Sequence, residues 1–194
     1  TALVNYHRNE ILKESDLPKK YFAYTPCYRQ EAGSYRTEER GMIRGYQFNK
    51  VEIVQYTSEE GSDKAFDEMI NVASSLVEGL GLHFRLSKLA AADCSHSMAR
   101  TTDIEVYLPS IGIYKEVSSA SNARSYQARR TMARYKDKDG KTHFCHTLNA
   151  SGLATSRLFP AILEQFQQED GSVIIPEVLR PFMGGKSKLT PKKK

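Results

Sequence analysis

The chain has 194 residues, of which 40% are apolar and 26% are charged, so it is long enough for one sizeable core or part of a larger domain. No apolar run approaches the roughly 20 residues of a membrane-spanning helix, which excludes a helical membrane protein. The net charge of +5 comes partly from five lysines in the last nine residues, which we expect to form a basic, disordered tail over 186–194. This weak basic bias fits a nucleic-acid partner without requiring one.

The cysteines indicate a reducing compartment. Cys27, Cys94 and Cys145 are odd in number and far apart, and no signal-peptide pattern comes before them. This usage is typical of reduced thiols, so we expect a cytoplasmic protein. Their spacing does not match a zinc site, and no zinc is expected.

The first half of the chain predicts a short helix, two strands and a long helix. Residues 3–12 favour the short helix. Aromatic-rich residues 21–31 and 46–56 favour two strands joined by a loop over 33–41. Residues 61–81 place apolar side chains at helical spacing and end in glycines, which predicts an amphipathic helix that covers a sheet.

The second half adds a hairpin, another strand and another helix. Residues 103–109 and 112–119 favour two strands joined by a tight turn, and residues 142–152 a strand that ends in a small-residue turn. The helix predicted over 155–168 must begin near its first residue to accommodate Pro160. Because hairpins outnumber βαβ units, we expect an α+β fold with a mostly antiparallel sheet flanked by helices.

Two polar patches fall on the first pair of predicted strands. Side chains two apart on a strand share a face, so Arg29 and Glu31 point the same way. Phe48, Lys50 and Glu52 likewise share one face of the returning strand, away from the apolar residues between them. The alternative is a solvated face with surface ion pairs and one exposed ring.

Two further patches lie in the second half. Glu116 and Ser118 are expected to share a strand face, with Ser119 next to them at the strand end, and a carboxylate beside hydroxyls suits Mg²⁺. Most such glutamates are nevertheless surface charges. In residues 149–157, small side chains let a ligand approach the backbone, and Arg157 falls in the first helical turn, where the dipole favours an anion. Arg157 could equally be a surface arginine.

Together the four patches form a set suited to a magnesium nucleotide beside an amino compound, and their motifs resemble a known family. The stretch "CYRQEAGS…RG.IR..QF.KVE" resembles motif 2 of bacterial-type seryl-tRNA synthetases, which are class II aminoacyl-tRNA synthetases. "YKEVSSASN…QARR" resembles their metal and nucleotide segment, "TLNASGLATSR" their motif 3, and "QFQQEDGSVIIPEVLRPFMGG" their closing segment. The resemblance implies that residues 1–185 are the carboxy-terminal part of a class II catalytic domain.

The resemblance implies a role for each matching residue at the nucleotide. Arg29 would hold the α-phosphate and the reacting carboxylate, and Glu31 would recognise the adenine end. Phe48 and Arg157 would stack on the two faces of adenine, with Arg157 also reaching the γ-phosphate. Glu116 and Ser119 would bind Mg²⁺. The implied ATP-binding residues are Arg29, Gln30, Glu31, Arg44, Phe48, Glu116, Val117, Ser118, Ser119 and Arg157, of which Arg29 and Arg157 are the implied catalytic residues.

The resemblance also implies a serine site and a reaction. Serine would be bound by Arg29, Glu52, Asn149 and Ser151, with its hydroxyl as the polar group that distinguishes it from alanine. Its carboxylate would attack the α-phosphorus of ATP, and the seryl group would then pass to tRNA(Ser). The implied partners are ATP, L-serine and tRNA(Ser), with Mg²⁺ as cofactor and a homodimer expected for the full-length protein.

Two alternatives stay open. A non-catalytic, synthetase-like protein could bind tRNA or a protein partner, although the presence of Arg29, Glu116 and Arg157 argues against it. An amino acid:carrier-protein ligase of the same fold would need a zinc site with cysteine, and no cysteine pair lies near Glu52 and Ser151. The family's T-x-E serine-binding stretch, its motif 1 and its helical tRNA-binding arm are expected outside this sequence, which leaves open whether the chain is active alone.

Overall fold

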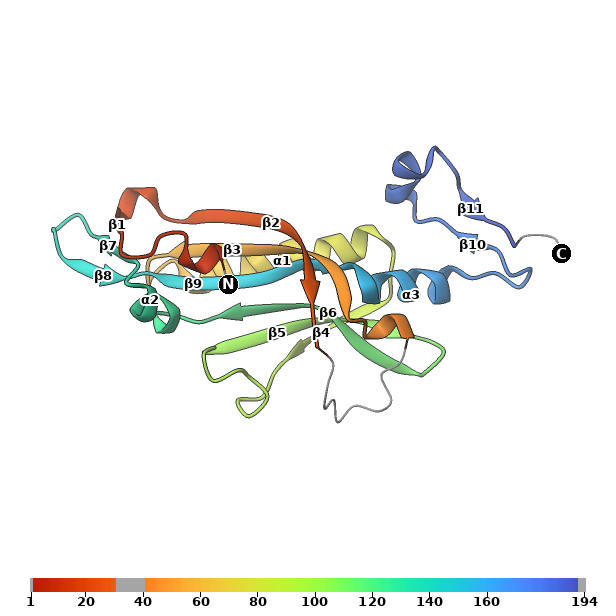
Figure 1. Cartoon of the computed structure of the whole chain (residues 1–194), viewed down its shortest axis with the longest axis horizontal. Coiled ribbons are helices and arrows are strands. Elements are labelled where there is room, and N and C mark those ends of the chain that lie inside the picture. Colours follow the sequence, from red (N-terminus) through yellow and green to blue (C-terminus); the bar gives the residue numbers. More distant parts are fainter. Residues whose placement is uncertain (1, 31–40, 192–194) are drawn as a thin grey trace.

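A six-stranded sheet forms the centre of the fold (Figure 1). The computed structural model describes residues 2–30 and 41–191. The sheet order is β2-β3-β9-β6-β5-β4, and every neighbouring pair is antiparallel. The strands, in that order, are Lys19–Tyr28, Gln47–Thr57, His146–Ala154, Ile113–Asn122, Arg100–Leu108 and Phe84–Lys88. The α+β prediction with a mostly antiparallel sheet is confirmed.

Two small sheets extend the fold at opposite ends (Figure 1). One contains β1 (Ile11–Lys13), β7 (Arg134–Lys136) and β8 (Thr142–Phe144), with β1 parallel to β7. The other pairs β10 (Val173–Ile174) with β11 (Lys188–Leu189). The structure here differs from the tail predicted over 186–194, because its first part is ordered by this pairing.

Helices complete the fold. They are α1 (Ser62–Gly79), α2 (Tyr126–Thr131) and α3 (Thr155–Phe166), together with the short 3-10 segments η1 (Leu3–Asn5), η2 (Glu14–Asp16), η3 (Gly41–Ile43) and η4 (Glu177–Met183). Helix α3 begins at Thr155, as Pro160 required. None of the helices in the described ranges is both long and apolar enough to cross a bilayer.

Helix α1 covers one face of the sheet, which leaves the other face for polar side chains. In Figure 1 it lies along the sheet behind β3 and β9. Phe66 and Met69 belong to one apolar cluster with Leu148 of β9, and their exposed fractions are at most 3%. Burying such a stripe against a sheet is the main force that holds an amphipathic helix in place. The predicted role of residues 61–81 is therefore confirmed.

A β-bulge interrupts the regular alternation of β6. Ser118 pairs with Ile104 and Glu116 with Glu105, which leaves Val117 as an extra residue. An extra residue shifts the alternation by one position, so residues three apart come to face the same side. Glu116 therefore shares the polar face with Ser119.

A second bulge lies on the adjacent strand β9. Ser151 pairs with Glu52 and Ala154 with Lys50, so two residues of β9 lie opposite the single residue Val51. By the same shift, Ser151 and Ala154 both face the side away from α1. The two bulges therefore bring polar side chains of neighbouring strands onto one face.

The amino-terminal segment differs from its prediction. Only Leu3–Asn5 is helical, and residues 11–13 form strand β1 instead of continuing a helix to residue 12. His7 is buried, with Nδ1 2.6 Å from Glu10 Oε2 and Nε2 2.6 Å from the hydroxyl of Tyr21. Contacts to β2 and β7 override the local preference for helix.

Several short elements were not predicted, among them strand β4 and helix α2, and one predicted strand is divided. Strand β4 and helix α2 are short and lack clear periodicity, so their place depends on partners elsewhere in the chain. The strand predicted over 142–152 is divided at Cys145, whose backbone N–H donates to the carbonyl of Ala133. Cys145 thus leaves the small sheet and β9 begins at the next residue.

Gly152, within the β9 bulge, offers a test of this packing. A Cβ at Gly152 would lie 3.0 Å from Cδ1 and 3.2 Å from Cγ1 of Ile53, so Gly152→Ala should lower the free energy of unfolding by about 1–3 kcal/mol in urea denaturation. Gly79→Ala is the control, because a Cβ there meets nothing within 4 Å and alanine should stabilise the helix by about 0.5–1 kcal/mol. Equal effects of the two changes would contradict a tightly packed bulge.

Candidate functional site

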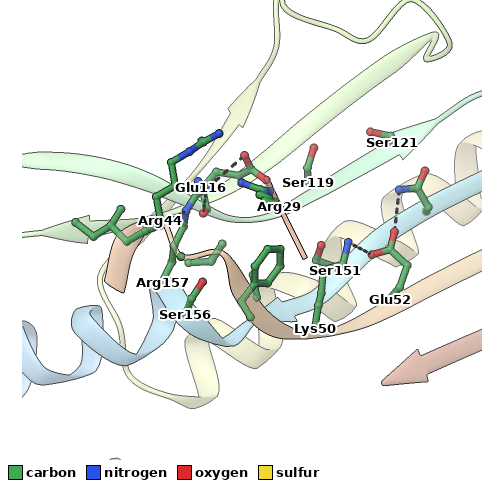
Figure 2. A pocket seen from close by; sticks show the side chains of 16 residues that line it. Arg29, Arg44, Lys50, Glu52, Glu116, Ser119, Ser121, Ser151, Ser156 and Arg157 are labelled. Atoms are coloured by element: carbon green, nitrogen blue, oxygen red, sulfur yellow. Dashed lines mark hydrogen bonds and ion pairs between the residues drawn. The ribbon is translucent and has the colours of Figure 1, made fainter. Parts of the chain in front are cut away.

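A polar cleft lies on the sheet face opposite α1 and collects residues from both halves of the chain (Figure 2). Its volume is about 170 Å³. It is lined by Arg29, Ile43, Arg44, Gly45, Phe48, Lys50, Glu52, Glu116, Val117, Ser119, Ser121, Asn149, Ser151, Ala154, Ser156 and Arg157. The shared face of Phe48, Lys50 and Glu52 is thus part of a cleft rather than an open solvated surface.

One end of the cleft is cationic. Figure 2 shows Arg29, Arg44 and Arg157 grouped around Glu116. The guanidinium carbon of Arg29 lies 5.0 Å from the centroid of the Phe48 ring, a cation–π contact. Three guanidinium groups beside one carboxylate leave a surplus of positive charge and many N–H donors, which suits a polyphosphate.

Arg157 is fixed in this end of the cleft. Its Nε donates to the carbonyl of Ile43 at 3.2 Å and its Nη1 to the carbonyl of Glu116 at 2.7 Å. Nη1 also lies 3.6 Å from the carboxylate of Glu116, and the side chain is 12% exposed. Arg157 is therefore not a surface arginine, and contacts to two other segments fix its orientation.

Glu116 and Ser119 lie between the cationic end and the middle of the cleft (Figure 2). The Glu116 side chain is 45% exposed and its carboxylate faces the cleft. Behind Ser119, Asp103 of β5 lies directly opposite it in the strand pairing. Burial raises the pKa of Asp103 to about 6, and the charges of Glu116 and Glu105 add to the rise, while Ser119 and Arg157 act in the opposite direction.

The other end of the cleft is built around Glu52. Lys50 Nζ lies 2.6 Å from Glu52 Oε2, and Asn149 Nδ2 donates to Glu52 Oε1 at 3.1 Å. Ser151 lies opposite Glu52 in the strand pairing. The Glu52 side chain is 22% exposed, so a ligand reaching this end meets a partly desolvated carboxylate, an amide and a hydroxyl. This set suits a small ligand with a hydroxyl or an ammonium group.

A larger hollow adjoins this acidic end. It has a volume of about 680 Å³ and shares Lys50, Glu52 and Asn149 with the cleft. Arg8 and Arg130 also line it. The cleft and this hollow together fall in the size range of small-molecule binding sites.

A comparison with protein families identifies the family of the chain. Residues 1–166 match the family described as the tRNA synthetase class II core domain (G, H, P, S and T). The chain belongs to this family. The sheet and the three segments that build the cleft are thus those of a class II synthetase core.

Individual relatives are synthetases for serine. Serine–tRNA ligase 2 of Clostridium acetobutylicum is 68% identical over 185 residues, which are 95% of this chain and 44% of that protein. The crystal structure of seryl-tRNA synthetase from Pyrococcus horikoshii complexed with ATP matches with a TM-score of 0.94 at 39% identity, over 100% of this chain and 44% of that one. Cytoplasmic serine–tRNA ligase from Naegleria fowleri in complex with AMP matches with a TM-score of 0.91 at 34% identity, over 98% and 46%. The synthetase core thus spans less than half the length of these relatives.

Most of the residues singled out in the sequence meet in the cleft of this synthetase core. These are Arg29, Arg44, Phe48, Glu52, Glu116, Val117, Ser119, Asn149, Ser151 and Arg157. Val117 contributes backbone, since its side chain is 1% exposed and lies in the core. Gln30 is exposed and does not line the cleft, and Glu31 lies outside the described residues.

The expected position of Ser118 requires correction. Ser118 was expected to share a face with Glu116, but its side chain is 0% exposed and its hydroxyl donates to the carbonyl of Ser151 at 2.6 Å. The bulge at Val117 causes this reversal. In the small-residue stretch 149–157, Asn149, Ser151 and Ala154 line the cleft.

Some residues of the site were not identified from the sequence. Ser121 could have been found, because it lies two positions beyond Ser119 on the same strand. Ser156 could have been found as the neighbour of Arg157 in the first helical turn. Asp103 carries no local signal, because its place behind Ser119 depends on the register between β5 and β6.

The buried hydroxyl of Ser118 allows a stability test that separates it from the cleft. Ser118→Ala removes the only hydroxyl donor shown for the Ser151 carbonyl among the described residues, so the free energy of unfolding should fall by about 1–2 kcal/mol. Ser156→Ala, at a half-buried cleft position, should change it by less than about 0.5 kcal/mol. Guanidinium denaturation measures both, and equal values would show that this hydrogen bond does not brace the two strands.

Proposed function

We propose that this chain is the part of a serine–tRNA ligase that activates serine with ATP and passes it to tRNA(Ser). The observation that carries the proposal is the polarity of one cleft, with Arg29, Arg44 and Arg157 at one end and Glu52 with Asn149 at the other. Such a cleft offers cationic groups to a triphosphate at one end and polar groups to an amino acid at the other, where it joins the larger hollow. Similarity to the serine–tRNA ligase of Clostridium acetobutylicum at 68% identity supports the choice of serine.

ATP would occupy the cationic end. The adenine ring would stack on Phe48 and the phosphates would bind Arg29, Arg44 and Arg157. The guanidinium carbon of Arg29 lies 5.0 Å from the centroid of the Phe48 ring. Arg29, which would bind the α-phosphate, would therefore lie beside the adenine ring. Arg157 needs little reordering to bind, because its two carbonyl contacts already fix it.

Serine would occupy the acidic end. Glu52, Asn149 and Ser151 present a carboxylate, an amide and a hydroxyl to its hydroxyl and ammonium groups. Alanine would leave these partly buried groups without a partner, and such a loss discriminates strongly between substrates. Arg29 would bind the serine carboxylate as well as the α-phosphate.

Mg²⁺ would be held by Glu116 and Ser119. The residues fit the ion, because the bulge at Val117 turns a carboxylate and a hydroxyl, both hard oxygen donors, toward the same space. Within the described residues no group of three or more His, Cys, Asp or Glu side chains could hold a metal, so substrate phosphates would complete the coordination. The bound ion would offset the negative charge of the phosphates.

The reaction then follows from position and charge. The serine carboxylate is ionised at neutral pH and attacks the α-phosphorus without a general base. The bond from the α-phosphorus to the bridging oxygen breaks, and pyrophosphate leaves as seryl-adenylate forms. Arg29 and Arg157 would stabilise the charge that develops on the phosphates. A hydroxyl of the terminal tRNA ribose would then attack the seryl carbonyl carbon, and AMP would leave.

The hollow beside Glu52 would admit the end of tRNA. It opens at the serine end of the cleft, and Arg8 and Arg130 could contact the phosphates of the acceptor strand. The full-length protein is expected to be a cytoplasmic homodimer.

Serine-dependent exchange of pyrophosphate into ATP tests the activation step. With Mg²⁺ present, serine should support exchange, whereas threonine, alanine and glycine should not. Arg29→Ala should reduce the rate by about 100-fold or more, since it removes a cation aimed at the developing charge. Arg85→Ala is the control, because Arg85 lies on β4 outside the cleft, where it pairs with Glu105 of β5.

Two outcomes would contradict the proposal. Exchange with another amino acid would reassign the substrate. In a protein that also carries the T-x-E stretch and motif 1, binding of ATP without exchange for any amino acid would favour a non-catalytic synthetase-like binding protein.

A further inference from the structure

Asp103 is a buried carboxylate that the proposed reaction does not use. Its exposed fraction is 9%, and it lies directly opposite Ser119 in the pairing of β5 with β6. This pairing places the Asp103 carboxylate beside the Ser119 side chain, which acts to lower the pKa of Asp103. Its Oδ1 is buried and has no hydrogen-bond partner among the described residues. A buried carboxylate oxygen without a partner is costly, so its presence needs an explanation.

We propose that Asp103 is a positioning residue that prepares Ser119 to bind Mg²⁺, an inference that rests on the proposed function. A serine hydroxyl has one proton and two lone pairs. A carboxylate directly opposite Ser119 can accept this proton, which would turn the lone pairs of the Ser119 oxygen toward the cleft. Asp103 also adds negative charge directly behind the site, which attracts a divalent cation.

The strand register places this pair at the edge of the β6 bulge. Asp103 faces Ser119 and Ile104 faces Ser118, and the next pair, Glu105 with Glu116, lies beyond the extra residue Val117. Asp103 and Glu105 are two positions apart on β5 and share the polar face with Glu116. The bulge thus gathers two acids of β5 behind the two cleft residues that would hold Mg²⁺.

Glu105 provides the contrast that isolates the role of Asp103. The Glu105 carboxylate accepts a hydrogen bond from Nε of Arg85 at 2.7 Å, so its negative charge is compensated by an arginine of the edge strand β4. Of the two acids, Asp103 is the one that lies opposite Ser119. Replacing either acid by its amide removes one negative charge from the same strand face, but only Asp103→Asn disturbs the orientation of the Ser119 hydroxyl.

The test compares ATP affinity with and without Mg²⁺ by calorimetry. In the unmodified chain, Mg²⁺ should tighten ATP binding. Asp103→Asn should reduce that gain by about tenfold or more, in line with residues that support a metal ligand. Its ATP affinity in the presence of EDTA should stay within about twofold of the unmodified chain. Glu105→Gln should keep both values.

A double variant shows whether Asp103 acts through Ser119. Ser119→Ala should lose the Mg²⁺-dependent gain, and adding Asp103→Asn should cause no further loss. Additive losses would overturn the inference, as would an unchanged gain in Asp103→Asn. A parallel loss with and without Mg²⁺ would also overturn it, because a purely structural role affects both affinities.

The unmodified chain tests the proposed function, and the variants test the role of Asp103. An unmodified chain that binds no ATP, or that gains nothing from Mg²⁺, would contradict the proposed function before any variant is compared. Should Asp103→Asn fail to fold, as judged by circular dichroism, Asp103→Ser supplies the same comparison with space for a water in place of the carboxylate.

Discussion

The cleft depends on two β-bulges in neighbouring strands. In a regular strand, Glu116 and Ser119 would face opposite sides of the sheet, as would Ser151 and Ala154. A bulge interrupts the hydrogen-bonded ladder, so it needs compensation nearby. The extra residue of β6, Val117, and the bulge residue Leu153 of β9 are both buried in one apolar cluster. The hydroxyl of Ser118 then joins the two strands through the carbonyl of Ser151.

The same arrangement fixes the charges of the cleft. Arg157 comes from α3, but its guanidinium is bound by the carbonyls of Ile43 and of Glu116, the residue next to the β6 bulge. A side chain with four rotatable bonds thereby loses most of its freedom before any ligand arrives. At the other end, Asn149 and Lys50 hold the two oxygens of Glu52. The separation of a cationic end from the end that contains Glu52 thus depends on backbone carbonyls as well as on side chains.

Local patterns in the sequence were sufficient for some of these features and not for others. The alternation that places Phe48, Lys50 and Glu52 on one face is local, and the structure agrees with it. Ser118 was misplaced because a bulge has no clear signature in one sequence. Asp103 was missed because register is set by pairing with a strand ten or more residues away. Residues 3–12 were misassigned because contacts of His7 with Tyr21 outweigh helical preference.

The resemblance to a known family supplied what local patterns could not. It assigned Arg29, Glu116 and Arg157 to one site although they come from three distant segments, and the cleft does bring them together. It also gave the Mg²⁺ role to Ser119 and not to Ser118, although it implied that both bind ATP. In the structure the buried hydroxyl of Ser118 donates to the carbonyl of Ser151, whereas Ser119 lines the cleft.

The bulges have a consequence for how these strands can change over generations. Between Glu116 and Ser121, or between Ser151 and Ala154, the loss or gain of a single codon would move every later side chain to the other face. Many amino-acid replacements there would alter one contact, whereas a change of length would exchange the polar lining with the core. The number of residues in these two stretches should therefore vary less than their identities.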